Sequence, residues 1–219
     1  MKKLVIASNN PGKLRELVPL LARMGIEAVP QADLGVGEAE EPHHTFLENA
    51  LAKARHASRA TGLAALADDS GLVVPALGGA PGVHSAHYAG HEGDRGARDA
   101  RNNQKLLGEL AGKPDRSAYY YCVLVLVRET GDPTPIVADG RWHGHIVSEP
   151  RGTNGFGYDP LFLIPEYHRT FGELSATVKH ALSHRGRALA QLRPALRRLT
   201  PLGSPSPTVE LTGPAHPSA

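Results

Sequence analysis

The chain has 219 residues, of which 41% are hydrophobic, and these values fit one domain of ordinary size with an apolar core. Its formal net charge of +2 is small and its basic residues are scattered, which argues against a nucleic-acid partner. Cys122 is the single cysteine, so an intrachain disulfide is excluded and a buried thiol in a reducing compartment is expected. No segment approaches the roughly 18 apolar residues of a membrane span, so we expect a cytoplasmic protein without a membrane partner.

The N-terminal segment is typical of a strand, a polar loop and a helix. Lys3 to Ala7 is an apolar run that predicts a buried strand, and apolar residues recur with helical spacing after Lys13. Pro19 lies inside that pattern, so we expect the helix to kink or to end early. The loop from Ser8 to Lys13 places a lysine at a helix N-terminus, which favours anion binding, although an ordinary helix cap has the same pattern.

A capping box marks the start of the next predicted helix. Thr45 and Glu48 stand ahead of an apolar pattern that runs to about Ala60. Strands and helices alternate after it, which predicts an α/β fold. Asp139-Gly140 is typical of a hairpin turn and indicates that part of the sheet is antiparallel. The predicted strands are residues 63–67, 72–74, 119–127 and 136–147, with a polar helix at about 97–110 between them.

The folded part is predicted to end with a helix that starts near Ser183, although Pro194 lies within its apolar pattern. The predicted domain therefore covers residues 1–200. Residues 201–219 contain five prolines and no apolar periodicity, so they cannot bury enough surface to offset their ordering entropy. We expect this tail to be disordered.

Two adjacent carboxylates, Asp68 and Asp69, follow an apolar run and precede Gly71. This order predicts that the pair lies at the end of a strand, just before a glycine turn. Carboxylates that repel each other are costly to bury together, so such a pair is typical of a cation site. In isolation, a solvated turn that caps a helix is an equally good interpretation.

A glycine-rich segment, Gly152 to Pro160, surrounds the aromatic residue Phe156. Glycines let the backbone approach a ligand closely, and the ring offers a flat face for stacking. The alternative is that the ring fills a gap under a loop. Further along, the ammonium of Lys179 could meet phosphate, and donors on His184 and Arg185 could recognise carbonyl oxygens.

Three further groups have simpler interpretations. Glu40 and Glu41 fit a solvated acidic stretch, and Lys53 fits the exposed face of its helix. The spacing of three histidines suggests zinc, but the glycines around them favour a loop. These histidines are His84, His87 and His91.

Taken in order, these segments resemble the inosine/xanthosine triphosphate pyrophosphatases, a family also called Ham1-like, over about residues 1–199. The resemblance implies an elongated α/β fold with a central mixed sheet flanked by helices, an active site in a cleft between two lobes, and a homodimer. The segments that carry it are Ser8 to Lys13, Thr45 to Ala50, Ala67 to Leu72, Gly78 to Gly82, Gly155 to Pro160 and Ser183 to Gly186.

The resemblance also implies Mg²⁺-dependent hydrolysis of ITP, dITP and XTP to the monophosphate and pyrophosphate. It implies that Asp69 is the catalytic base. Asp69, together with Glu40 or Glu41, is our prediction for the Mg²⁺ ligands, and Asp68 could share the work of the base. The predicted substrate-binding residues are Ser8, Asn9, Asn10, Pro11, Gly12, Lys13, Lys53, Ser70, Phe156, Gly157, Tyr158, Asp159, Lys179, His184 and Arg185.

Selection among purines can be argued from their edges. A donor from Arg185 or His184 aimed at position 6 could form a hydrogen bond to a keto oxygen O6, whereas the amine of adenine would oppose it. Guanine shares O6, so its rejection must depend on the 2-amino group near Phe156 to Asp159. Two other functions remain open. One is a general nucleoside triphosphatase that releases orthophosphate, although the chain lacks a Gly-x4-Gly-Lys-Ser/Thr loop, and the other is a nucleotide sensor without catalysis.

Overall fold

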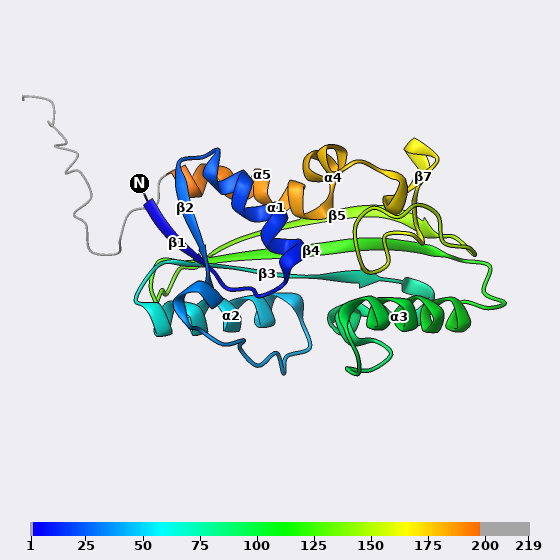
Figure 1. The fold of residues 1–219 in the computed structure, drawn as a ribbon, viewed down its shortest axis with the longest axis horizontal. Helices are drawn as coiled ribbons and strands as arrows, with labels where there is room; N and C mark the ends of the chain where they lie inside the picture. Colours follow the sequence, from blue (N-terminus) through cyan, green and yellow to red (C-terminus); the bar gives the residue numbers. More distant parts are fainter. Residues whose placement is uncertain (1, 198–219) are drawn as a thin grey trace, which may run out of the picture.

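The computed structural model describes residues 2–197 and places a long β-sheet between two layers of helices (Figure 1). The tail predicted for residues 201–219 lies outside this described part. The strands are β1 (Lys2–Ile6), β2 (Ile26–Pro30), β3 (Ala65–Val73), β4 (Ser117–Val127), β5 (Ile136–Ile146), β6 (Phe162–Ile164) and β7 (Arg169–Thr170). The α-helices are α1 (Pro11–Ala22), α2 (Phe46–Thr61), α3 (Arg95–Glu109), α4 (Ala176–Leu182) and α5 (His184–Arg197).

The seven strands form one sheet in the order β2-β1-β3-β4-β5-β6-β7. The pairs among β2, β1 and β3 are parallel, and all later pairs are antiparallel. The predicted α/β fold with a mixed sheet is therefore confirmed. No helix in residues 2–197 is long and apolar enough to span a membrane.

Helices cover both faces of the sheet, with α1, α4 and α5 on one face and α2 and α3 on the other (Figure 1). On the first face, Leu17 and Leu21 of α1 share an apolar cluster with Leu192 of α5. On the second face, α2 packs its small residues, including Ala50 and Ala54, against the sheet. Each face thus buries one apolar stripe of each covering helix, as amphipathic helices do.

The first two helices begin where local capping signals place them. Asn10 caps α1 by accepting hydrogen bonds from the backbone N–H groups of Gly12 and Lys13. Thr45 caps α2 by accepting from Glu48, as the capping box predicts. The expectation that Pro19 ends or kinks α1 is wrong in respect of its end, because the helix continues to Ala22. Buried Leu17 and Leu21 on either side of the proline stabilise this helix by packing.

The predicted break after Asp69 is absent, because residues 63–67 and 72–74 do not form two separate strands. β3 is continuous and pairs with β4 through Asp69 and Gly71. Gly71 does not form a turn. Its lack of a side chain allows a close contact, since a Cβ there would collide with the side chain of Ser85 and the backbone oxygen of Gly82. Ser85 Oγ also accepts a hydrogen bond from Leu72 N at 2.9 Å, which holds the chain that packs over β3.

The predicted hairpin at Asp139-Gly140 is also wrong, although the sheet is antiparallel there. β5 runs without interruption past both residues and pairs with β4. A Cβ on Gly140 would lie 2.8 Å from the backbone nitrogen of Ala188 and would collide with the backbone oxygen of His184. The glycine therefore lets the start of α5 lie directly on the sheet.

Several short elements were missed by the sequence interpretation. These are the strands β2, β6 and β7 and the helix α4, which has seven residues. Each is too short to show a clear apolar period, so only its pairing or packing defines it. α3 begins two residues before its predicted start, because Asp94 caps it by accepting from Ala97 N at 2.9 Å.

We predict that Gly140→Ala destabilises the protein, because the added methyl group meets backbone atoms of α5 that cannot move independently. The loss should be at least about 1–3 kcal/mol, as for other overpacked cores. Gly108→Ala is the matched control, since that helical position has open space and should gain up to about 1 kcal/mol. Urea denaturation of both variants measures the difference, and equal midpoints would contradict the packing argument.

Candidate active site

Asp68 and Asp69 project from opposite faces of β3, because they are consecutive residues in one strand. Both are buried, with 1% and 6% of their surface exposed. Asp68 contacts Lys13 of α1 and Arg185 of α5, whereas Asp69 contacts Lys53 of α2. The two carboxylates therefore do not form one joint cation site, contrary to the sequence interpretation.

Asp68 is the centre of a buried ion cluster. Its carboxylate pairs with the Lys13 ammonium and accepts a hydrogen bond from Arg185 Nε at 2.8 Å and another from Cys122 Sγ at 3.2 Å. Burial raises the pKa of Asp68, but Arg185 and Lys13 outweigh burial and hold this pKa well below its usual range. A carboxylate that is so strongly held in the charged form is a poor proton acceptor, so the geometry does not support a share in the work of the base.

Asp69 has a different environment. Its Oδ1 accepts a hydrogen bond from Lys53 Nζ at 2.8 Å, and the same ammonium donates to Glu41 Oε2 at 2.9 Å. Its Oδ2 is buried and has no hydrogen-bond partner within residues 2–197. Burial raises the pKa of Asp69 to about 6, even though Lys53 and Lys13 act in the opposite direction. This carboxyl group can therefore change its protonation state near neutral pH.

The donor set around Asp69 fits Mg²⁺ only if other ligands complete it. Asp69 and Glu41 both reach one ammonium, so both can approach one cation, whereas Glu40 is exposed and is not among the contacts of Lys53. No group of three His, Cys, Asp or Glu side chains in residues 2–197 could hold a metal ion. Mg²⁺ characteristically uses one or two carboxylates together with water and substrate phosphates, which matches two carboxylates and one unpartnered oxygen.

The three spaced histidines do not converge on a metal position in the described chain. The rings of His87 and His91 stack with centroids 4.3 Å apart, and those of His84 and His87 meet edge to face at 5.7 Å. Their mutual packing accounts for their proximity without a metal ion.

The loop that joins β1 to α1 is held by its own polar side chains. Ser8 Oγ accepts a hydrogen bond from Asn10 N at 3.2 Å, and Asn10 Oδ1 accepts from Gly12 N at 2.9 Å. Asn9 Oδ1 is buried without a hydrogen-bond partner in the part of the chain that the structure describes. Pro11 opens α1 at a position where its missing N–H costs nothing. The loop therefore presents the N-terminus of α1 in a fixed orientation.

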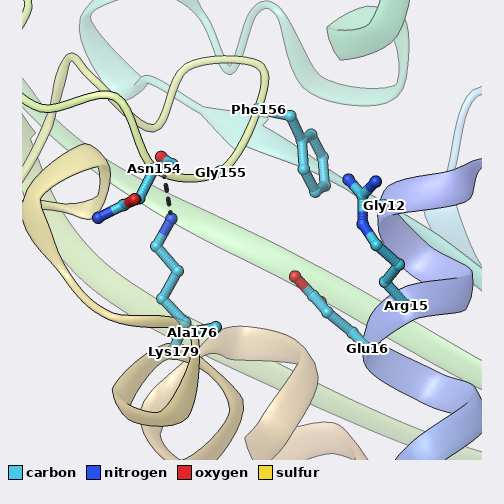
Figure 2. Close-up of a pocket in the computed structure, with 8 residues that line it drawn as sticks. All are labelled: Gly12, Arg15, Glu16, Asn154, Gly155, Phe156, Ala176 and Lys179. Atoms are coloured by element: carbon cyan, nitrogen blue, oxygen red, sulfur yellow. Dashed lines mark hydrogen bonds between the residues drawn. The ribbon is translucent and has the colours of Figure 1, made fainter.

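A cavity of about 450 Å³ lies beside this loop (Figure 2). Its size is within the usual range for small-molecule sites. Phe156 forms one wall and lies against Gly12, where a Cβ would be only 2.7 Å from the ring. The lining residues are Gly12, Arg15, Glu16, Asn154, Gly155, Phe156, Ala176 and Lys179.

The segment that carries Phe156 is fastened by a buried aspartate. Asp159 Oδ2 accepts from Phe156 N at 3.1 Å and pairs with Lys179 Nζ at 2.9 Å, and its Oδ1 accepts from Tyr120 at 3.1 Å. Burial raises the pKa of Asp159, and Lys179 opposes that rise. Tyr158 is buried and donates to the backbone oxygen of Ser85 at 2.9 Å. Asp159 and Tyr158 thus hold the wall of the cavity in place.

His184 and Arg185 are both buried at the start of α5. The His184 ring stacks on Tyr120 with centroids 4.8 Å apart, and burial keeps its pKa well below the ordinary value, so the ring is neutral. Arg185 pairs with Glu16 as well as with Asp68, and its Nη2 donates to Ser70 Oγ at 3.0 Å. Arg185 thus contacts Glu16, which lines the cavity, without lining the cavity itself.

Five residues that line the cavity are not among the predicted substrate-binding residues, although two of them belong to the predicted glycine-rich segment. They are Arg15, Glu16, Asn154, Gly155 and Ala176. A signal existed for Glu16, because it lies three residues after Lys13 and therefore on the same face of α1. No comparable signal marks Ala176, whose place depends on the packing of the short helix α4.

Comparison with known proteins identifies close relatives. The model of the Ham1 family matches residues 4–195. A dITP/XTP pyrophosphatase of Ralstonia nicotianae is 59% identical over 197 residues, which are 90% of this chain and 98% of the relative. A protein of the same name from Burkholderia pseudomallei is 60% identical over 190 residues, which are 87% and 91% of the two chains.

A solved structure shows the same fold. It is a HAM1 protein from Coxiella burnetii, with a TM-score of 0.83 and 48% identity, and it covers 90% of this chain and all of its own. This chain belongs to the Ham1 family.

Proposed function

We propose that this protein is an Mg²⁺-dependent hydrolase that cleaves ITP, dITP and XTP to the nucleoside monophosphate and pyrophosphate. The observation that carries the proposal is the buried Asp69 carboxylate, whose Oδ2 lacks a partner in the described chain while its Oδ1 shares the Lys53 ammonium with Glu41. The names of the relatives support the substrate class. The family resemblance and the composition lead us to propose in addition a homodimer in the cytoplasm.

The reaction forms a bond between a water oxygen and the α-phosphorus and breaks the bond to pyrophosphate. In this proposal, Asp69 accepts the proton of the attacking water, since its raised pKa makes it a better base than an ordinary aspartate. Lys53 and the positive end of the α1 helix dipole offset phosphate charge. When bound at Asp69 and Glu41, Mg²⁺ would supply further neutralisation of the phosphate oxygens.

The cavity would hold the purine. Phe156 offers a flat apolar face that any purine can use, so it adds affinity without choosing among bases. Choice would come from Arg185, whose guanidinium carries more N–H groups than its contacts with Asp68, Glu16 and Ser70 require. A keto oxygen at position 6 can accept such a donor, whereas the amine of adenine would leave it unpaired.

The first test separates the three functions by their products. Purified protein with Mg²⁺ and ITP or XTP should release pyrophosphate at least about 100-fold faster than with ATP, because a buried donor rejects a mismatched group strongly. Pyrophosphate and orthophosphate are assayed separately for ITP, XTP, GTP and ATP. Orthophosphate from all four would indicate a general triphosphatase, and binding without product would indicate a sensor.

The second test removes the charge of the proposed base. Asp69→Asn keeps the shape of the side chain, so ITP should still bind while kcat falls by about 10²–10⁴-fold, the usual contribution of a positioned base. Glu40→Gln is the control, because Glu40 is exposed and is not among the contacts of Lys53. Steady-state kinetics and calorimetry of ITP binding measure the two effects. An Asp69→Asn protein with undiminished kcat would contradict the role of Asp69.

The third test uses pH. Because the pKa of Asp69 is about 6, the base is charged above this pH and becomes protonated below it. The value of kcat/KM for ITP should therefore be half-maximal near pH 6, fall about tenfold per pH unit well below it and level off towards neutral pH. The residual activity of Asp69→Asn, measured over the same range, should lack this acid limb. A wild-type profile that stays flat well below pH 6 would rule out the assignment.

A further inference from the structure

A polar stripe on α3 contacts two loops of the candidate active site, the one that carries Phe156 and the one that joins β1 to α1. Arg95, Asp99 and Asn103 are four residues apart, so they lie on one face of the helix. Asp99 Oδ2 accepts from Gly157 N at 2.9 Å, and Asn103 Nδ2 donates to Gly157 O at 3.0 Å. Both backbone polar groups of the residue after Phe156 are thus bound to α3, which fixes this wall of the cavity from outside.

Arg95 extends the stripe to the loop that joins β1 to α1. Its Nη1 donates to Asn10 Oδ1 at 2.7 Å, and its guanidinium carbon lies 4.5 Å from the centroid of the Phe156 ring. The side chain is 36% exposed, so it is positioned by contacts and remains accessible to solvent. One cation therefore lies between the N-terminus of α1 and the aromatic wall, which are the two places where a nucleotide's phosphates and base would bind.

Asn10 Oδ1 accepts more hydrogen bonds than it has lone pairs for. Gly12 N donates at 2.9 Å, Lys13 N at 3.3 Å and Arg95 Nη1 at 2.7 Å, all to this one oxygen. An amide oxygen has two lone pairs, so one of these three hydrogen bonds is weak. The two backbone groups belong to the helix cap, which leaves Arg95 as the donor that can change partner without disturbing α1.

The charge of Arg95 is also less neutralised than that of the lysines at the site. Lys53 and Lys179 each have a carboxylate oxygen within 2.9 Å, and Lys13 contacts Asp68 closely. The ion pair of Arg95 with Asp99 is 3.9 Å long, and that carboxylate is already bound to Gly157 N. A loosely paired guanidinium retains its attraction for an oxyanion, and its planar fork matches two phosphate oxygens.

We propose that Arg95 is a further substrate-binding residue, which exchanges Asn10 for oxygens of the polyphosphate while its guanidinium stays over Phe156. This inference rests on the proposed function. The sequence interpretation did not find the residue, because the predicted helix began at about residue 97, and Arg95 is brought to Asn10 only by the tertiary fold.

The test separates the phosphate and base parts of the substrate. Dissociation constants for Mg²⁺-pyrophosphate and for inosine are measured by NMR titration of the wild type, Arg95→Ala and Arg95→Lys. Arg95→Ala should weaken pyrophosphate binding about tenfold and leave inosine binding unchanged, because a charged hydrogen bond is lost only for the phosphate. Arg95→Lys keeps the charge but not the planar fork of the guanidinium, so its affinity for pyrophosphate should lie between those of the wild type and Arg95→Ala.

Arg101→Ala is the matched control, because this arginine is also on α3 but pairs with Glu92 at 4.0 Å. Thermal unfolding of each variant checks that the fold is retained. Weaker inosine binding with unchanged pyrophosphate binding would show that Arg95 only supports Phe156, and unchanged binding of both would remove it from the site. Either result overturns the proposal.

These titrations need no turnover, so they test Arg95 even if no pyrophosphate is released from ITP. If the wild type releases no pyrophosphate in the product assay, but Arg95→Ala binds pyrophosphate about tenfold more weakly than the wild type, the proposed function is contradicted and Arg95 is supported as an oxyanion ligand.

Discussion

The site depends on one buried ion cluster, in which Asp68 of β3 holds Lys13 of α1 and Arg185 of α5. Taking such groups out of water costs several kcal/mol for each ion, and the cost is offset only when every charge is paired with good geometry. Here Glu16 is a second carboxylate partner for Arg185, besides Asp68, and completes the cluster. Because the cluster joins three separate segments, it sets where the N-terminus of α1 lies relative to β3 and α5.

The same strand gives its next residue the opposite property. Asp68 is surrounded by two cations and stays ionised, whereas Asp69 is buried against one shared ammonium and has a pKa of about 6. Neighbouring carboxylates with separated pKa values allow one to be structural and the other to exchange a proton. Strand geometry makes this division possible, since successive residues face different layers of the fold.

Local signals predicted the start of two helices well, because caps depend on residues a few positions apart. Asn10 and Thr45 each cap a helix through contacts within their own segment. The continuous strands β3 and β5 could not be predicted in the same way. Gly71 and Gly140 are residues typical of turns in the sequence. In the structure each is a glycine because a distant segment packs against it and leaves no room for a side chain. That distant partner is absent from any local window of sequence.

The misplaced turn explains why the site was only partly predicted. A turn after Asp69 would let both carboxylates face one cation, so the prediction of a joint site followed from the predicted break in β3. A continuous strand separates them, and Asp69 instead shares the Lys53 ammonium with Glu41, 28 residues earlier in the chain and one of the two glutamates predicted beside it at the metal. Many of the residues at the site could therefore be predicted from the sequence, because they lie in short loop and cap motifs that a local window contains. The separation of Asp68 from Asp69 could not be predicted, because it depends on which face of one strand each residue occupies.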